Sequence, residues 1–202
     1  LQTLINPRLV SDQINSLVTL AEQSGREYYE RWEFLNAYSG CMLGNPAISV
    51  IADAYSKGIR TFDAEKAYRY AVNSSAKFGN DALGYTPGNM GVAQTLEYAY
   101  TDWCISQLAG YLNKEEDAQL FLQKSKAYKN IFDKEKGWFR PRNADGTWMP
   151  WPEEGRMKEG YGCMEANIYQ QGWFVPHDLD GMVALMGGKE KVLADLRSLF
   201  EH

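Results

Sequence analysis

The feature of the sequence that most constrains the fold is a long apolar periodicity between residues 90 and 112. Its members recur three, four or five positions apart, close to the period of an α-helix: Val92, Leu96, Ala99, Trp103, Leu108 and Leu112. A stripe of this kind places its side chains along one side of a helix, where they have to be covered by other elements. We therefore predict a deeply packed helix in the middle of the chain.

Six shorter segments show the same period together with start or stop signals. Proline directly follows asparagine at residues 6–7 and 45–46, and proline fits the first turn of a helix. Asp63 is a predicted N-cap, and Asn113 with Glu116 has the spacing of a capping box. The predicted segments are residues 7–25, 45–58, 63–78, 113–128, 178–186 and 189–200. About seven helices with little sheet indicate an all-α chain of antiparallel helical hairpins.

Composition and charge argue against several classes of partner. The 202 residues are 45% hydrophobic, which is enough for the core of one domain. The 21 basic and 26 acidic residues are scattered, and no run of lysine or arginine could neutralise a phosphate backbone or an anionic membrane. No apolar stretch reaches the length of about 18 residues that a membrane span needs. We expect neither nucleic acid nor membrane as a partner.

The segment from residue 133 to 163 interrupts the helical pattern and is rich in glycine, proline and tryptophan. Asp145-Gly146 predicts a turn between short extended pieces, and a loop this long in a compact domain is usually functional. Helical hairpins with aromatic loops fit an open solenoid or a closed ring around a cleft. Since no fixed repeat is present, the ring is the better prediction. Flat aromatic rings beside polar groups are typical of a carbohydrate site.

Residues 164–178, "MEANIYQQGWFVPHD", concentrate carboxyl, amide, aromatic and imidazole groups. This stretch resembles the E-[GA]-N-x-W-Q-Y-x-W-x-V-P-H-D block of glycoside hydrolase family 92, the calcium-dependent exo-acting α-mannosidases. "SGCMLGNPAISVIADAYSKGI", "TLEYAYTDWCISQLA" and "GGKEKVLADLRSLF" are similar to other helical blocks of that family, in the same order. The resemblance covers essentially the whole chain, with departures at Tyr169 and at Gln171-Gly172.

The resemblance implies an (α/α)6 barrel of which this chain is the central part. Residues 1–202 are then a single partial domain that forms an incomplete toroid. The exposed apolar flanks of such a toroid favour self-association. The resemblance also implies a protein that is periplasmic, secreted or on the cell surface.

The resemblance makes Glu165 the catalytic acid. Hydrolysis with inversion needs a protonated carboxyl group for the leaving oxygen and a second carboxylate that activates water. Met164, Ile168 and Trp173 flank Glu165, and desolvation by these neighbours would raise its pKa. The alternative is a solvated glutamate at the start of a helix.

Trp32, Asn167 and Gln170 are the predicted substrate-binding residues, and only Trp32 among the tryptophans has family support. Asn167 and Gln170 would orient Glu165 or sugar hydroxyls, although buried amides also commonly satisfy backbone groups alone. Trp138, Trp148 and Trp151 offer further rings for a sugar subsite, but large aromatic side chains at helix ends more often lie in the core.

Asp178 and His177 are interpreted as a helix cap and a wall residue, because no motif pairs them with a nucleophile. Calcium enters only through the resemblance. Its ligands are expected mainly outside this chain, so no residue is assigned to a metal.

The sequence therefore predicts a fragment of an inverting, exo-acting α-mannosidase that hydrolyses terminal α-mannosides of glycans. Taken in isolation, the fragment is expected to be inactive. Two alternatives remain open: a noncatalytic helical interaction domain, and another (α/α)6 glycoside hydrolase such as a glucan-acting one.

Overall fold

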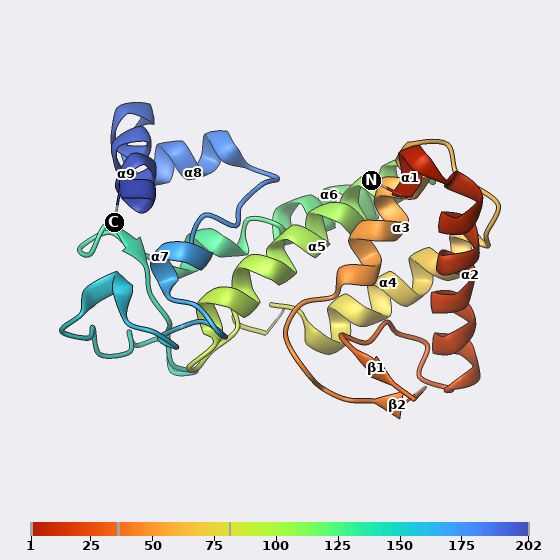
Figure 1. Ribbon diagram of the computed structural model, residues 1–202, viewed down its shortest axis with the longest axis horizontal. Helices are drawn as coiled ribbons and strands as arrows, with labels where there is room; N and C mark the ends of the chain where they lie inside the picture. Colours follow the sequence, from red (N-terminus) through yellow and green to blue (C-terminus); the bar gives the residue numbers. More distant parts are fainter. Residues whose placement is uncertain (1, 36, 81, 202) are drawn as a thin grey trace. The chain divides into compact units, whose positions relative to one another are not determined.

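A computed structural model of the chain describes residues 2–35, 37–80 and 82–201 (Figure 1). The described residues divide into two compact units, one from Leu1–Gly79 and Thr101–Ser125, the other from Asn80–Tyr100 and Lys126–His202. They form nine α-helices and two antiparallel strand pairs, which confirms the prediction of a mostly helical chain. None of these helices is both long enough and apolar enough to span a membrane.

The first unit consists of helices and a small β-hairpin. Helix α2 contacts both α3 and α4, and strands β1 and β2 pair through Glu33 with Tyr38 and Phe34 with Ala37. The last half of α5 also belongs to this unit. The elements are α1 (Gln2–Ile5), α2 (Pro7–Gln23), β1 (Glu33–Phe34), β2 (Ala37–Tyr38), α3 (Pro46–Ser56), α4 (Ala64–Phe78), α5 (Gly91–Tyr111) and α6 (Glu115–Lys124).

The second unit combines the first half of α5 with loops, short strands and the last helices of the chain. Helices α8 and α9, drawn in blue, pack against each other (Figure 1). The elements are the 3₁₀ helix η1 (Ala127–Ile131), β3 (Phe132–Asp133), β4 (Trp138–Phe139), the 3₁₀ helix η2 (Gly155–Met157), α7 (Ile168–Gln171), α8 (Leu179–Leu185) and α9 (Lys189–Glu201).

The helix starts agree with the sequence at most positions. Asn6 caps α2 by accepting from the Leu9 amide at 3.2 Å, and Asp63 caps α4 by accepting from the Lys66 amide at 2.9 Å. The seven predicted helices are all present. The two additional ones, α1 and α7, have four residues each, which is too short for a period to be visible.

The capping box predicted at Asn113 is wrong. Asn113 is left-handed, with φ of 58°, and α6 begins only after Lys114. The Lys114 amide donates to the Ala109 carbonyl at 2.9 Å, and the Asn113 amide donates to the Gly110 carbonyl at 3.2 Å. This pair of bonds closes the C-terminus of α5, where asparagine tolerates the left-handed conformation. Asn113 therefore ends one helix instead of starting the next.

Polar contacts tie α4, α5 and α6 together inside the first unit. The Ser75 hydroxyl donates to the buried Asp102 carboxylate at 2.6 Å, and Lys124 Nζ donates to Ser75 Oγ at 2.8 Å. Lys124 Nζ also lies 3.9 Å from the Asp102 carboxylate, so the buried charge has a cation beside it. Four residues of the predicted apolar stripe, Val92, Leu96, Ala99 and Leu108, are buried, whereas Trp103 and Leu112 are half-buried.

Trp138 is the central side chain of the second unit. It is 1% exposed, and its indole N–H donates to the Ile168 carbonyl at 2.7 Å. Its ring meets Tyr169 and Trp173 edge to face, with centroids 5.6 and 5.2 Å away. Trp138 is thus a core residue that supports α7. The chain divides into two compact units, and the prediction of one partial domain over residues 1–202 stays a prediction.

Replacing Trp138 by Phe is expected to destabilise the second unit by about 1–3 kcal/mol, from the lost hydrogen bond and the cavity left by the smaller ring. Trp148→Phe is the matched control, because Trp148 is only half-buried in the same loop. Urea unfolding followed by circular dichroism measures both variants. Equal stability of the two would contradict the central role of Trp138.

Candidate functional site

Glu165 lies on a closed loop at residues 160–166. The Gly160 amide donates to the Ala166 carbonyl at 3.0 Å and so brings the two ends of the loop together. Three of its residues have left-handed backbones, with φ of 72° at Gly160, 76° at Gly162 and 52° at Glu165. The glycines adopt this conformation at no steric cost. For glutamate it costs on the order of 1 kcal/mol, and strain of this kind often occurs at functional positions.

Gly162 packs this loop closely against α5. The Ala93 amide of α5 donates to the Gly162 carbonyl at 3.0 Å. A Cβ atom at position 162 would lie 2.8 Å from Ile168 Cγ2 and 3.0 Å from Val92 Cγ2, closer than side chains can approach. Only glycine therefore allows the loop to approach the helix this closely.

The burial predicted for Glu165 is not found. Its side chain is exposed within the described chain, whereas Cys163 and Ile168 on either side are buried. These two side chains occupy the inward positions of the loop, and Glu165 is left on the outside. Burial raises the pKa of the Cys163 thiol to about 12, so this group is neutral and inert.

Asn167 and Gln170 form a reciprocal capping box at the start of α7. Asn167 Oδ1 accepts from the Gln170 amide at 3.0 Å, and Gln170 Oε1 accepts from the Asn167 amide at 3.2 Å. Asn167 is buried and Gln170 is exposed. These amide oxygens satisfy backbone groups, the alternative that the sequence left open, and they fix the direction in which the chain leaves Glu165.

A pocket of about 360 Å³ lies beside this capping box. Its lining residues are Ala166, Gln170, Gln171, Trp173 and Phe174. The pocket therefore brings one predicted sugar-binding residue, Gln170, next to the residue that follows Glu165. The indole nitrogen of Trp173 is buried and has no hydrogen-bond partner among the described residues. Aromatic rings and amides around a small pocket suit a hydroxyl-rich ligand.

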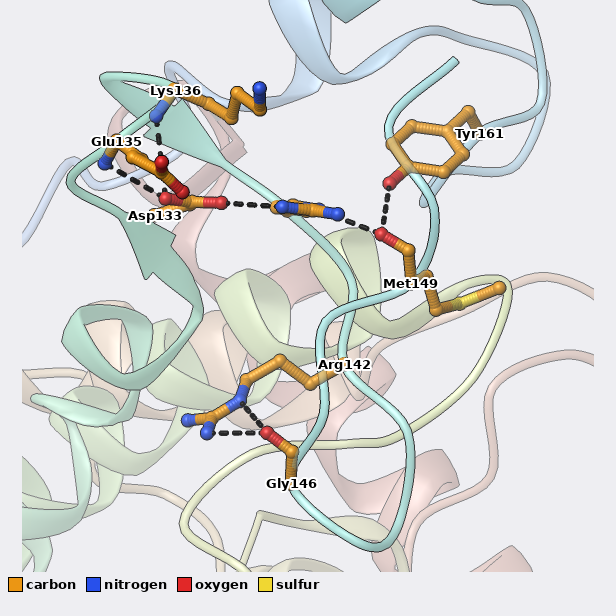
Figure 2. A network of polar contacts seen from close by, with 8 residues as sticks. Asp133, Glu135, Lys136, Arg142, Gly146, Met149 and Tyr161 are labelled. Atoms are coloured by element: carbon orange, nitrogen blue, oxygen red, sulfur yellow. Dashed lines mark hydrogen bonds and ion pairs between the residues drawn. The ribbon is translucent and has the colours of Figure 1, made fainter.

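Arg140 links β3 to the loop at Met149, and Figure 2 shows Asp133, Met149 and Tyr161 of this network. The Arg140 guanidinium donates to the Asp133 carboxylate at 2.8 Å and to the Met149 carbonyl at 2.7 Å. The Tyr161 hydroxyl donates to the same Met149 carbonyl at 3.4 Å. Burial alone would raise the pKa of Asp133, but hydrogen bonds from Arg140 and two backbone amides lower it. An ionised Asp133 therefore holds Arg140 in place.

Asp178 caps α8, as predicted, and its carboxylate accepts further hydrogen bonds. Its carboxylate accepts from the Gly181 amide at 3.2 Å, from Lys126 Nζ at 2.8 Å and from the Tyr128 hydroxyl at 2.6 Å. Burial raises its pKa, but these bonds outweigh it and lower the pKa to about 2. His177 packs between the rings of Tyr100 and Tyr128, with centroids 6.1 and 5.9 Å away. This arrangement is that of a structural cluster.

Trp32 belongs to the first unit, where its side chain is 59% exposed. Its carbonyl accepts from the amide and hydroxyl of Ser39 at 3.3 and 2.7 Å, next to the β1–β2 hairpin. Glu165 lies in the second unit. The prediction that Trp32 and Glu165 serve one substrate therefore stays a prediction.

Sequence reasoning overlooked Glu97 on α5. Ala93, Glu97 and Tyr100 share one face of the helix by their spacing of four and three residues. Ala93 contacts the loop at Gly162, and the Tyr100 ring meets Phe174 of the pocket edge to face at 5.4 Å. Glu97 is half-buried, and burial raises its pKa. Glu97 is charged and lies outside the apolar stripe of α5, so the apolar periodicity of the sequence did not identify it.

Comparisons with known proteins identify a matching family model and similar solved structures. The family model described as the glycosyl hydrolase family 92 catalytic domain matches residues 1–202. A family GH92 α-mannosidase from Bacteroides thetaiotaomicron is 31% identical with a TM-score of 0.87, covering 96% of this chain and 27% of that chain. A family GH92 inverting mannosidase from the same species is 31% identical with a TM-score of 0.84, over 94% of this chain and 27% of that one.

A curated relative described as an uncharacterized secreted glycosidase, from Arthroderma benhamiae, is 27% identical over 207 residues. The match covers 78% of this chain and 26% of the relative. The chain thus spans about a quarter of the length of the relatives it matches. The chain therefore belongs to glycoside hydrolase family 92, within the region that the family model describes as its catalytic domain.

Gly162→Ala is expected to destabilise the second unit by about 2–4 kcal/mol, because it adds contacts with Val92 and Ile168 to left-handed strain. Gly160→Ala is the matched control. It has a similar φ, but no atom lies within 4 Å of the added Cβ. Its expected cost is about 1 kcal/mol. Equal losses in urea unfolding would show that close packing on α5 is not what fixes the loop.

Asp178→Asn is expected to lose about 2 kcal/mol of stability at neutral pH, since a shift of one pKa unit corresponds to about 1.4 kcal/mol. The folded pKa is depressed, so this stabilisation is present above the ordinary value of 3.8 and is lost as the pH falls to about 2. Asparagine still caps a helix, so the variant isolates the charge. Urea unfolding against pH measures the effect.

Asp180→Asn provides the control, because Asp180 is exposed in the first turn of the same helix. Its stability should follow that of the unmodified chain at every pH. A loss in Asp178→Asn that persists unchanged at pH 2 would contradict the electrostatic account.

Proposed function

We propose that this chain is part of the catalytic domain of an exo-acting, inverting α-mannosidase that hydrolyses terminal α-mannosides of glycans. The observation that carries the proposal is the family match over all 202 residues, together with the loop that presents Glu165. The two similar structures from Bacteroides thetaiotaomicron, an α-mannosidase and an inverting mannosidase, support the substrate and the stereochemistry.

Glu165 is proposed as the general acid. An inverting hydrolase needs one carboxyl group that protonates the leaving oxygen and a second carboxylate, roughly 6.5–9.5 Å away, that activates water. The loop supports the first role, because its closure at Gly160 and its packing at Gly162 restrict where the exposed Glu165 carboxyl can go. The second carboxylate is proposed to lie outside this chain, in the remaining length of the protein.

The terminal mannose is proposed to occupy the pocket beside α7. Gln170 and Gln171 would bond its hydroxyls there, and the rings of Trp173 and Phe174 would cover its apolar face. Asn167 is proposed to act through Gln170, because its buried side chain holds the cap and does not line the pocket. Trp32 is proposed as a further sugar contact of the first unit.

The described residues do not fit a calcium site. They contain no group of three His, Cys, Asp or Glu side chains close enough to hold an ion, and Asp178 is engaged by Lys126, Tyr128 and Gly181. We assign calcium to the whole enzyme as a cofactor whose ligands lie mainly outside these residues.

The proposal extends to the cellular location of the protein and to its self-association. Secretion or a periplasmic location is supported by the curated relative described as secreted. Self-association of the chain is supported by apolar side chains on its surface, such as Phe34 at 72% and Leu35 at 87% exposure.

The longer enzyme is expected to release β-mannose first from an aryl α-mannoside, because inversion reverses the anomeric configuration. Proton NMR of the anomeric signals during the first turnovers measures this outcome. The isolated 202-residue chain, as the control, should release no mannose, since it holds the proposed acid without a base. If α-mannose appears first, inversion is excluded. If the longer enzyme cleaves nothing, the proposed activity is refuted. If the isolated chain releases mannose, the expected inactivity of the fragment is refuted.

A further inference from the structure

A second pocket, of about 410 Å³, lies at the other end of the Glu165 loop. Its lining residues are Asn89, Pro150, Trp151, Pro152, Lys158, Glu159, Gly160, Tyr161 and Gly162. The last three residues are the first part of the loop itself. The bond from the Gly160 amide to the Ala166 carbonyl closes the loop, and Ala166 is one residue, about 3.8 Å between Cα atoms, from Glu165. One pocket therefore adjoins each end of the loop that carries the acid.

The aromatic side of this pocket is held in place by several contacts. Trp151 stands between two prolines, whose rings restrict the backbone on both sides. Its indole meets the Tyr161 ring edge to face, with centroids 6.2 Å apart. The Arg140 guanidinium carbon lies 5.9 Å from the centre of the Trp151 ring, and Arg140 is itself fixed by Asp133 and Met149. Trp151 remains half-buried, so part of its ring is open to solvent.

The rim of the pocket is polar and carries both signs of charge. Asn89, Lys158 and Glu159 are exposed, and Lys158 is paired with Glu154 at 2.7 Å. An amide, an ammonium and a carboxylate together both donate and accept hydrogen bonds. A fixed aromatic ring with such a rim fits a neutral molecule that has an apolar face and many hydroxyls, which describes a sugar.

We propose that this Trp151 pocket binds the sugar on the leaving-group side of the cleaved bond. The inference rests on the proposed function and deepens it. An acid that protonates a glycosidic oxygen stands between the sugar that is released and the sugar that remains. With the terminal mannose in the pocket of Gln170 and Trp173, the pocket lined by the first residues of the loop receives the leaving-group sugar. Trp151, Lys158 and Glu159 then determine which glycans are cleaved.

Binding is tested on the 202-residue chain by titrating α-linked mannobiose and following the indole NMR signals. The Trp151 signal, assigned by its absence in Trp151→Phe, should shift and saturate, and glycerol at equal concentration should not shift it. Trp151→Ala lacks this signal, so its binding is followed through the backbone amide signals of Gly160, Tyr161 and Gly162 in the pocket lining. It should bind about tenfold or more weakly, since the ring supplies the apolar contact. Trp151→Phe should retain part of the affinity, and Trp148→Ala, outside the pocket lining, should retain all of it.

No saturable shift, an equal shift with glycerol, or equal weakening by Trp148→Ala would overturn the pocket as a sugar site. Both alanine variants must keep the remaining indole signals at the positions of the folded chain. If Trp151→Ala loses them, Trp151→Phe and the surface variant Glu159→Gln carry the test, each expected to weaken binding while the remaining indole signals stay unchanged.

The leaving-group assignment is tested on the longer enzyme. Trp151→Ala should lower the ratio of kcat/KM for mannobiose to kcat/KM for α-mannosyl fluoride about tenfold, because fluoride is too small to use the pocket. An unchanged ratio would overturn the assignment. Binding in the isolated chain without any mannosidase activity in the longer enzyme would refute the proposed function and the leaving-group role, while the pocket would stand as a sugar site.

Discussion

The close packing of Gly162 on α5 is the constraint on which the candidate site depends. The loop of residues 160–166 is seven residues long, and its two ends meet through one backbone hydrogen bond. By itself such a loop would sample many conformations. The contact of Gly162 with Val92 and Ile168, and the bond from Ala93, tie it to the long helix. The left-handed backbone of Glu165 persists because these neighbours determine it.

Residues of this loop line both pockets: Gly160, Tyr161 and Gly162 line one, and Ala166 lines the other. On one side, the capping box of Asn167 and Gln170 begins α7 directly after the loop, and the Trp138 indole N–H donates to the Ile168 carbonyl in the first turn of α7. On the other side, Arg140 fixes the Met149 carbonyl, which also accepts from Tyr161 (Figure 2). The chemistry at Glu165 is therefore positioned by core residues that contact no substrate, which is how precise sites are generally built.

Much of the fold could be predicted from the sequence, because helix periods and caps are local signals. Asp63 and Asp178 cap the helices that their positions suggested, and four of the six residues of the predicted apolar stripe are buried. Asn113 shows the limit of this reasoning, since a residue before an acidic run can equally end the preceding helix. The cysteines show the same limit, since Cys41 is exposed whereas Cys104 and Cys163 are buried.

The site was predictable only in part. The resemblance pointed to the segment around Glu165, but not to its outward direction, which follows from the inward positions of Cys163 and Ile168. The role of Gly162 depends on Val92, seventy positions away, and no local pattern reports such a contact. The pocket at Trp151 likewise joins Asn89 to a distant loop.

The central claim is that this loop presents the proton donor, and Glu165→Gln in the longer enzyme tests it most directly. The amide keeps the shape but cannot donate the proton, so cleavage of α-linked mannobiose should fall by about 10²–10⁴. A dinitrophenyl α-mannoside, whose leaving group departs as a stable anion, should retain far more activity. Glu153→Gln, an exposed acid of the same unit, should change neither rate. Equal losses on both substrates, or no loss on either, would show that the proton donor is another group.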